Sequence, residues 1–307
     1  MNTKRFSKSV RRYWPLFLMA LPGIAYFFIN NYLPMAGLVV AFKNYNFQLG
    51  IWGSKFIGFE NFRFLFRTRD AFIITRNTIL YNVGFIAINT VFSVAVAIIL
   101  NEIRFRFAAR LYQTIILLPY LISMIIVAYL TFSFLSTDQG FLDKTLIPLL
   151  GGKSVNWYSE TKYWPFILNI VSLWKGFGFY SVIYLSAVVG IDRTYYEAAE
   201  LDGANKMQVI FNITIPHITP VISVMVLLAI GRIFYSDFGL FYRVPMNSGP
   251  LFSVTNVIDT YVYRGLIVLG DIGMSAAAGL YQAVVGFILV FGTNLIVRKL
   301  NPENALF

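Results

Sequence analysis

The chain contains no cysteine and a single histidine, and only 13% of its 307 residues are charged. The absence of cysteine excludes disulfides, thiol catalysis and cysteine-ligated metal sites. The one imidazole, His217, has no acidic or cysteine partner nearby in the sequence, so it forms neither a metal site nor a catalytic triad, and we assign it a surface role. We therefore predict that this chain has no catalytic residue and no metal site.

Apolar residues are abundant instead, since 58% of the chain is hydrophobic and 18% is aromatic. A chain this apolar and this poor in charge is typical of an integral membrane protein rather than a soluble domain. The formal net charge of +11 does not indicate nucleic-acid binding, because the 25 Lys and Arg residues gather at the ends of apolar runs and form no continuous basic face. We interpret them as membrane anchors.

Six apolar runs are each long enough to cross about 30 Å of hydrocarbon. The first is longer than a signal-peptide core and has no clear cleavage site, so we expect an uncleaved, kinked span. Dense positive charge next to span ends predicts that both termini face the cytoplasm. The predicted fold is an all-α membrane protein with spans at residues 13–42, 77–100, 111–134, 164–190, 219–242 and 275–298.

A single transmembrane domain, 1–307, is the simplest organisation, because no internal repeat and no low-complexity linker is present. Residues 43–75 mix polar residues with alternating phenylalanines, which is typical of a segment lying at the membrane interface. We divide the domain into an N-terminal part, 1–75, and a core, 76–298.

The stretch 194–220 is a polar interruption between two long apolar runs. Thr194 and Glu197 have the spacing of a capping box, and Gly203 falls where a left-handed residue would end that helix. These residues predict a short helix that ends in a turn at glycine.

A second helix is expected directly after this glycine. Asn205 and Gln208 repeat the capping spacing, and Pro216 forces an end near Ile215. Together the two helices form a helix–glycine–helix elbow between two membrane spans.

The elbow carries a further pattern, because Glu197-Ala198-Ala199, Gly203, Ile213 and Pro216 stand at the spacing of the EAA loop. This loop is the signature of permease subunits of binding-protein-dependent ABC importers, which the chain therefore resembles. Ile215 stands where the family usually has leucine, and the two side chains have similar volumes. The resemblance implies the type I ABC importer permease fold and a cytoplasmic elbow, 194–220, that couples to the ATPase through Glu197, Ala198, Ala199, Asp202, Gly203, Ala204, Phe211 and Pro216.

The segment FIGFENF and the later Arg76-Asn77-Thr78 look like the lead-in to the core of carbohydrate-type permeases. Within that group the chain is most similar to LplB-type subunits, which handle oligosaccharides derived from polysaccharides. The resemblance implies a bacterial plasma-membrane protein whose partners are a second homologous permease, two ATPase subunits and an extracytoplasmic solute-binding lipoprotein.

The chain offers no nucleotide site of its own. Gly151-Gly152-Lys153-Ser154 resembles the end of a P-loop, but Ile147 occupies the position where the motif requires glycine. We therefore expect no cofactor in this chain, with ATP and Mg²⁺ bound by the partner ATPase subunits.

Two cations, Lys175 and Arg232, each lie roughly midway along a predicted span, where a lipid-facing charge would cost about 2.5–3.5 kcal/mol. Either they line the substrate route, where two cations would favour an acidic oligosaccharide of the pectin or alginate type, or they pair with a carboxylate such as Asp237 and support packing. Tyrosines on these spans suit stacking on sugar rings, although most of the 19 tyrosines suit interface belts. The predicted pathway residues are Lys175, Tyr180, Tyr184, Arg232, Tyr235 and Asp237.

Three other classes of membrane protein make different demands on the sequence. An ion-coupled secondary sugar transporter would place acidic residues inside spans, whereas Asp and Glu lie almost wholly in the predicted loops. A polytopic membrane enzyme would need a catalytic dyad or a metal cluster, and the sequence has neither. An ABC permease for amino acids or osmolytes stays open as the alternative to an oligosaccharide permease.

Overall fold

The computed structural model describes residues 3–103 and 105–300. Arg104, which contributes to the predicted charge pattern, and residues 301–307, the predicted cytoplasmic end, lie outside the described residues. The chain divides into two compact units, which we describe separately. Unit 1 comprises Met1–Phe64 and Gly265–Leu280, and unit 2 comprises Leu65–Arg264 and Tyr281–Phe307.

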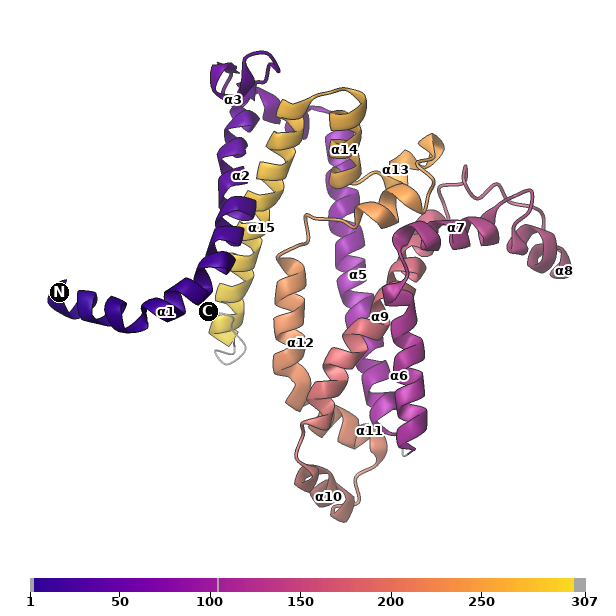
Figure 1. Cartoon of the computed structure of the whole chain (residues 1–307). Helices are drawn as coiled ribbons and strands as arrows, with labels where there is room; N and C mark the ends of the chain where they lie inside the picture. Colours follow the sequence, from indigo (N-terminus) through magenta and orange to yellow (C-terminus); the bar gives the residue numbers. More distant parts are fainter. Residues whose placement is uncertain (1–2, 104, 301–307) are drawn as a thin grey trace. The chain divides into compact units, whose positions relative to one another are not determined.

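Unit 1 begins with consecutive helical segments that include an apolar span from Tyr13 to Phe42 (Figure 1). A π-helical turn, η1, directly precedes α2, whose second residue is Pro34, and the ring of this proline cannot be accommodated by regular α-helical hydrogen bonding. The span predicted for residues 13–42 is therefore confirmed. Its segments are α1 (Thr3–Phe27), η1 (Phe28–Tyr32), α2 (Leu33–Met35) and η2 (Ala36–Phe42).

The rest of the N-terminal part of unit 1 folds around Phe42. Its ring contacts Phe56, Phe59 and Phe62, and the amide of Asn61 donates to the carbonyl oxygens of Ala41 and Lys43 at 3.0 and 2.9 Å. A short antiparallel ladder pairs β1 with β2. The elements here are β1 (Lys43–Asn44), α3 (Gly50–Gly53), β2 (Lys55–Phe56) and η3 (Glu60–Phe62).

Unit 2 is built on α5 (Arg69–Asn101) and α9 (Trp164–Val189), which pack along much of their length (Figure 1). Because α5 already begins at Arg69, the interfacial segment predicted for 43–75 ends earlier than expected. The other elements, apart from those of the elbow, are α4 (Phe64–Arg67), α6 (Arg106–Leu121), α7 (Met124–Leu135), η4 (Leu142–Leu146), α8 (Ile147–Leu149), α12 (Ile215–Ile230), η6 (Gly239–Arg243), η7 (Gly249–Leu251), α13 (Phe252–Thr255), α14 (Ile258–Val268) and α15 (Ile272–Leu300). The two units share α4, α14 and α15.

Two glycine–asparagine contacts bring α5 and α9 close together. A Cβ at Gly84 would lie 3.4 Å from Asn169 Oδ1, and a Cβ at Gly176 would lie 3.0 Å from Asn89 Oδ1. Both amide oxygens are buried and have no hydrogen-bond partner among the described residues. Glycine at these two positions leaves room for the facing asparagine side chains, as small residues commonly do at helix–helix contacts in membranes.

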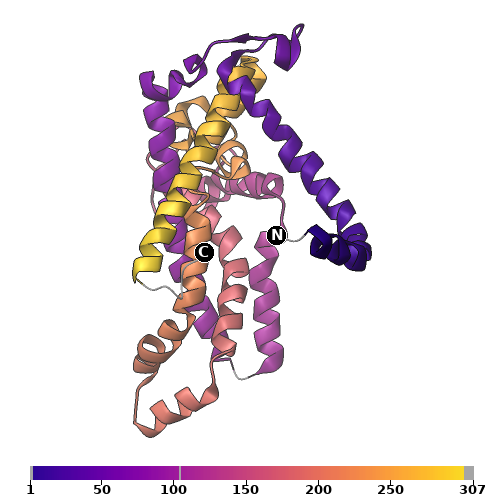
Figure 2. The ribbon, with the colours of Figure 1, turned by 90° about the vertical axis from the view of Figure 1, so that its left-hand side faces the viewer.

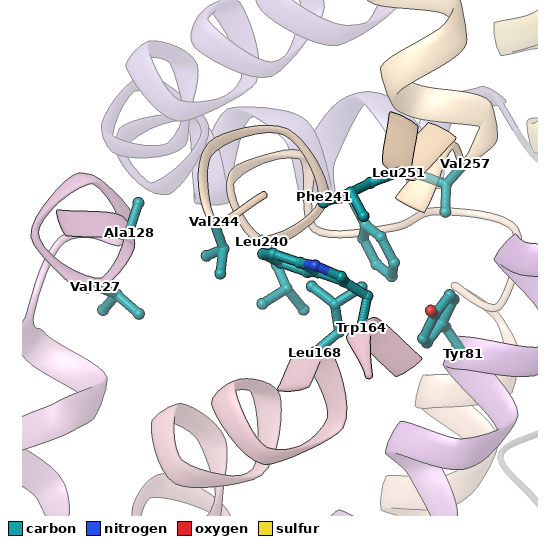
Figure 3. Close-up of a cluster of buried hydrophobic side chains, with 10 residues drawn as sticks. All are labelled: Tyr81, Val127, Ala128, Trp164, Leu168, Leu240, Phe241, Val244, Leu251 and Val257. Atoms are coloured by element: carbon teal, nitrogen blue, oxygen red, sulfur yellow. The ribbon is translucent and has the colours of Figure 1, made fainter. Parts of the chain in front are cut away.

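Two apolar clusters hold unit 2 together. In the first, Trp164 of α9 and Phe241 of η6 are buried together, and the Phe241 ring packs edge-on against Tyr81 of α5 with ring centroids 4.9 Å apart (Figure 3). The second joins the end of α5 to the end of α9 and to Ile218 at the start of α12. The second cluster therefore supports the end of the bundle from which the elbow projects.

Within residues 3–103 and 105–300, five helices are long and apolar enough to cross a membrane, and a bent helix pair raises the count to six if it forms one span. The predicted span 111–134 corresponds to α6 and α7, which meet at 94°. The predicted span 219–242 is wrong in its limits, since the apolar helical segment runs from Lys206 to Ile230. The reasons for this shift lie in the elbow.

Candidate functional site

The N-cap of the first elbow helix, α10 (Arg193–Leu201), lies two residues before the predicted one. Asp192 is the N-cap residue, and its Oδ1 accepts from the backbone N–H of Thr194 at 2.9 Å and from the Thr194 hydroxyl at 3.0 Å. These two hydrogen bonds hold the pKa of the exposed Asp192 carboxyl below its ordinary value. The predicted Thr194 cap is therefore wrong, because the carboxylate two residues earlier is the better acceptor.

Gly203 ends this helix in a Schellman motif. Its φ is +74°, its N–H donates to Glu200 O, and the N–H of Ala204 donates to Ala199 O. This arrangement satisfies two carbonyl oxygens that a helix end otherwise leaves unpaired. The left-handed turn predicted at Gly203 is confirmed.

The second elbow helix, α11 (Lys206–Val209), starts with a complete capping box between Asn205 and Gln208, as predicted. It does not end at Pro216. A π-helical turn, η5 (Ile210–Thr214), leads directly into α12, whose first turn contains Pro216. The wider turn removes the need for a proline N–H, so the helix continues into the membrane span and the predicted end near Ile215 is wrong.

Two polar contacts connect the elbow to the bundle. The Lys206 ammonium lies 2.7 Å from a Glu102 carboxylate oxygen at the end of α5, and the Tyr196 and Thr214 hydroxyls lie 3.3 Å apart. A hollow lined partly by Glu102, Glu200 and Lys206 separates α10 and α11 from the end of α5. The Lys206–Glu102 pair could not be predicted from local spacing because the two residues are 104 positions apart.

The outer surface of the elbow is open. Both views place α10 and α11 beyond the end of α9 and the start of α12 (Figures 1 and 2). Leu201, at the tip, is 90% exposed, and Met207 is also exposed. Of the predicted coupling residues, Ala199 and Ala204 are half-buried, and the exposed ones are Glu197, Ala198, Asp202, Gly203, Phe211 and Pro216.

Lys175, in the middle of α9, faces the bend between α6 and α7. Its ammonium donates to the carbonyl oxygens of Pro119, Tyr120 and Ile122 at 3.3, 3.1 and 2.6 Å. These carbonyls lack regular helical partners because α6 ends there, and a cation is favoured at the carboxyl end of a helix. The contacts favour the packing interpretation of Lys175 over the substrate-route interpretation.

Arg232 does not lie within a membrane helix, because α12 ends at Ile230. The residues that follow form an unwound stretch in which Arg232, Tyr235 and Asp237 are exposed. Asp237 Oδ1 accepts from Leu240 N at 3.1 Å, and Asp237 forms no ion pair with either cation among the described residues. The proposed carboxylate pairing of Lys175 and Arg232 is thus not observed.

The tyrosines predicted to meet sugar differ in their surroundings. Tyr184 is only 2% exposed and belongs to the second apolar cluster, which does not favour contact with a substrate. Tyr180 is partly exposed and packs edge-on against Phe179, which in turn stacks on Tyr120 at the α6–α7 bend. Tyr235 is 40% exposed on the unwound stretch.

Comparison with known proteins gives concordant results. The family described as binding-protein-dependent transport system inner membrane component matches residues 89–302. Protein LplB of Bacillus subtilis (strain 168) is 36% identical, covering 94% of this chain and 90% of its own length. The polygalacturonan/rhamnogalacturonan transport system permease protein YteP of the same organism is 34% identical over 94% of this chain and 89% of its own length.

A solved structure is also similar from end to end. A chain of a bacterial ABC transporter involved in the import of the acidic polysaccharide alginate superposes with a TM-score of 0.88 at 30% identity, covering 97% of this chain and 99% of that chain. The same transporter type in complex with an alginate pentasaccharide-bound periplasmic protein gives a TM-score of 0.87 at 30% identity, covering 96% and 98% of the two chains. This chain therefore belongs to the family of binding-protein-dependent transport system inner membrane components, the permease subunits of ABC importers.

Proposed function

We propose that this chain is a permease subunit of an ATP-driven importer for oligosaccharides derived from polysaccharides. The observation that carries the proposal is the likeness over nearly the whole chain to a subunit of the alginate importer, supported by the identity with LplB and YteP. The proposal makes the chain a transport subunit that performs no covalent chemistry. Its task is to expose the transport route alternately to the two sides of the membrane.

The cargo that we propose is an acidic oligosaccharide. Alginate and polygalacturonan, which two of the similar proteins handle, are polymers of uronic acids. Arg232 supports this assignment, because it is exposed on an unwound stretch and forms no ion pair among the described residues. An unpaired guanidinium is suited to bidentate binding of a carboxylate. Tyr235, three residues away, offers a ring and a hydroxyl to the sugar.

The remaining parts of the machine are proposed to come from partner chains. They are a second homologous permease, two ATPase subunits that bind ATP and Mg²⁺, and an extracytoplasmic binding lipoprotein. Support comes from the family description and from the neighbouring structure that contains a periplasmic protein. In this arrangement the chain lies in the bacterial plasma membrane with both termini in the cytoplasm.

The elbow is proposed to transmit closure of the ATPases to the membrane helices. The exposed Leu201 and Met207 offer apolar surface to a partner, and the direct continuation of α11 through η5 into α12 gives a stiff connection. The Lys206–Glu102 pair links the same element to α5. A movement of the elbow would therefore be passed to α12 through the continuous helix, and only weakly to α5, because both side chains of the Lys206–Glu102 pair are solvent-exposed.

Co-purification tests the proposal. The tagged chain, extracted in mild detergent, should bring down a second permease and an ATPase, and the complex should hydrolyse ATP faster when binding protein loaded with uronic-acid oligosaccharide is added. A chain that purifies alone and drives sugar uptake with an ion gradient would contradict the proposal and support a secondary transporter.

A further inference from the structure

The stretch 231–238, between α12 and η6, is an interruption of regular structure at the end of a membrane span. Gly231 begins it, and a Cβ at this position would lie 2.4 Å from a methyl group of Val290 on α15. Where a helix stops at membrane depth, backbone groups lose their partners and need others. Backbone groups of residues 233–236 find such partners in side chains of neighbouring helices.

Asn82 of α5 is the main partner. Its amide nitrogen lies 2.9 Å from Ile233 O, 3.2 Å from Tyr235 O and 3.3 Å from the Ser236 hydroxyl. The residue is half-buried, so its hydrogen bonds are partly shielded from solvent. The same nitrogen also lies 2.9 Å from Thr78 O of its own helix, so its two protons are shared among four acceptors, two of which are the carbonyl oxygens that flank Phe234.

Two further side chains complete the arrangement. The Gln282 amide on α15 donates to Phe234 O at 2.6 Å, and Asp259 Oδ2 on α14 accepts from Ser236 N at 2.8 Å. Gln282 is buried and also lies 3.4 Å from Asp259 Oδ2. Three helices therefore supply polar side chains to four consecutive residues, 233–236.

These contacts determine which side chains of residues 231–238 are buried and which are exposed. Phe234 turns inward, is 6% exposed and packs edge-on against Tyr281. Arg232 and Tyr235, on either side of it, stay exposed. A continuous helix would satisfy the same backbone groups by itself, so the side-chain anchors are not needed for hydrogen bonding alone. What they add is a backbone conformation in which Arg232 and Tyr235 stay exposed.

We propose that Asn82, Asp259 and Gln282 are positioning residues of the transport route: they hold 231–238 in its unwound form and thereby aim Arg232 and Tyr235 at the carboxylate and ring of an acidic sugar. The proposal rests on the proposed function. It adds that selectivity for the cargo depends on side chains that never touch the cargo.

Thiol accessibility tests the geometry without a transport assay. Because the chain has no cysteine, each of the variants Tyr235→Cys and Phe234→Cys carries a single thiol in this chain. In the assembled transporter in membrane vesicles, we expect a membrane-impermeant methanethiosulfonate reagent to modify Tyr235→Cys and not Phe234→Cys. Addition of Asn82→Ala should abolish this difference, whereas Asn89→Ala, which removes an α5 amide that donates only to Phe85 O of its own helix, should preserve it.

Transport kinetics supply the second readout, with the complete transporter in proteoliposomes and a uronic-acid oligosaccharide as cargo. Loss of one or two hydrogen bonds should raise the apparent KM of the Asn82→Ala complex for the oligosaccharide about five- to tenfold. The maximal uptake rate, at saturating oligosaccharide and ATP, should change little. Asn89→Ala should leave KM unchanged. Gln282→Met, which keeps the side-chain volume and removes the donor, should act like Asn82→Ala and serves as the test if Asn82→Ala fails to assemble.

The outcomes separate the two proposals. Equal modification of the Tyr235→Cys and Phe234→Cys variants, or the same KM in Asn82→Ala and Gln282→Met as in the wild type, would overturn the positioning role while sugar import stands. Absence of ATP-dependent sugar uptake by the wild-type complex would instead overturn the proposed function.

Discussion

Asp192 sets the start of α10, and this role depends on its charge. The Thr194 N–H and hydroxyl both donate to its carboxylate, which lowers its pKa from the ordinary value of 3.8. A lowered pKa means that the cap stabilises the helix at pH values above the ordinary pKa, and that this contribution is lost as the pH falls through the folded-state pKa. At neutral pH the cap is therefore fully formed.

We predict that Asp192→Ala speeds hydrogen exchange of the first-turn amides of α10 at neutral pH, because their acceptor is lost. Asp192→Asn retains a cap and should show near-normal protection relative to the intrinsic exchange rate at each pH, without the loss of protection in the acid range expected for the carboxylate cap. Exchange measured by mass spectrometry on the complex decides the point, and unaltered protection in Asp192→Ala would show that the cap does not hold the helix start.

Gly203 carries the other residue-level requirement of the elbow. With φ at +74°, a β-branched residue would be strained by about 1–2 kcal/mol, although no atom outside its immediate chain neighbours lies within 4 Å of a Cβ built there. The difficulty is one of backbone conformation and not of space.

We predict that Gly203→Val reaches the membrane and assembles but separates ATP hydrolysis from uptake, since the angle between α10 and α11 changes. Gly203→Asn should retain most of the coupling, because asparagine tolerates the left-handed region. ATPase activity and sugar uptake measured in the same vesicles give the ratio, and an unchanged ratio in the valine variant would remove the elbow from the coupling pathway.

At the scale of helices, the contact between α6 and α9 depends on Gly178. A Cβ at Gly178 would lie 1.8 Å from the carbonyl oxygen of Ile116, so alanine cannot be accepted without moving a helix backbone. Overpacking of this kind typically destabilises a protein by about 1–3 kcal/mol.

We predict that Gly178→Ala lowers the thermal unfolding midpoint of the detergent-solubilised complex, whereas Gly292→Ala, in a helical position with nothing within 4 Å of its Cβ, does not. The paired measurement removes the general effect of replacing a helical glycine. Equal midpoints for both variants would show that α6 yields and that the contact is not tight.

The number of membrane spans can be predicted from the sequence, but their limits cannot. Apolar length was enough to find each span, because the hydrocarbon thickness fixes it. The limits of the fifth span differ from the prediction for two reasons. The π-helical turn η5 accommodates Pro216, which the sequence pattern marks as a helix end, and the apolar run continues past Ile230 without a break in composition. A change of backbone conformation inside a uniformly apolar run leaves no trace in hydropathy.

The candidate site was only partly predictable. The elbow could be found from local spacing, because capping residues and a left-handed glycine act within a few positions. The anchors of 231–238 could not, since Asn82 lies 151 positions from Ile233 and Gln282 lies 48 positions from Phe234. Lys175 was placed correctly in its helix, but its three carbonyl partners arise only from the 94° bend between α6 and α7.

At the scale of the whole molecule, unit 2 contains two regions that differ in chemistry. The elbow offers an exposed surface at one end of the bundle, and the anchored stretch 231–238 follows the far end of α12. Because α11, η5 and α12 are continuous, one helical segment links the two. Movement of the elbow would therefore act on the segment that we propose to contact the sugar.

Uptake of labelled uronic-acid oligosaccharide into proteoliposomes that contain the complete transporter tests the central claim most directly. The account predicts uptake that requires ATP and the binding protein, and an Arg232→Met variant that loses about tenfold of the preference for acidic over neutral oligosaccharide, because one charge-assisted contact is removed. Uptake that proceeds on an ion gradient without ATP, or no uptake of any oligosaccharide by the assembled complex, would contradict it.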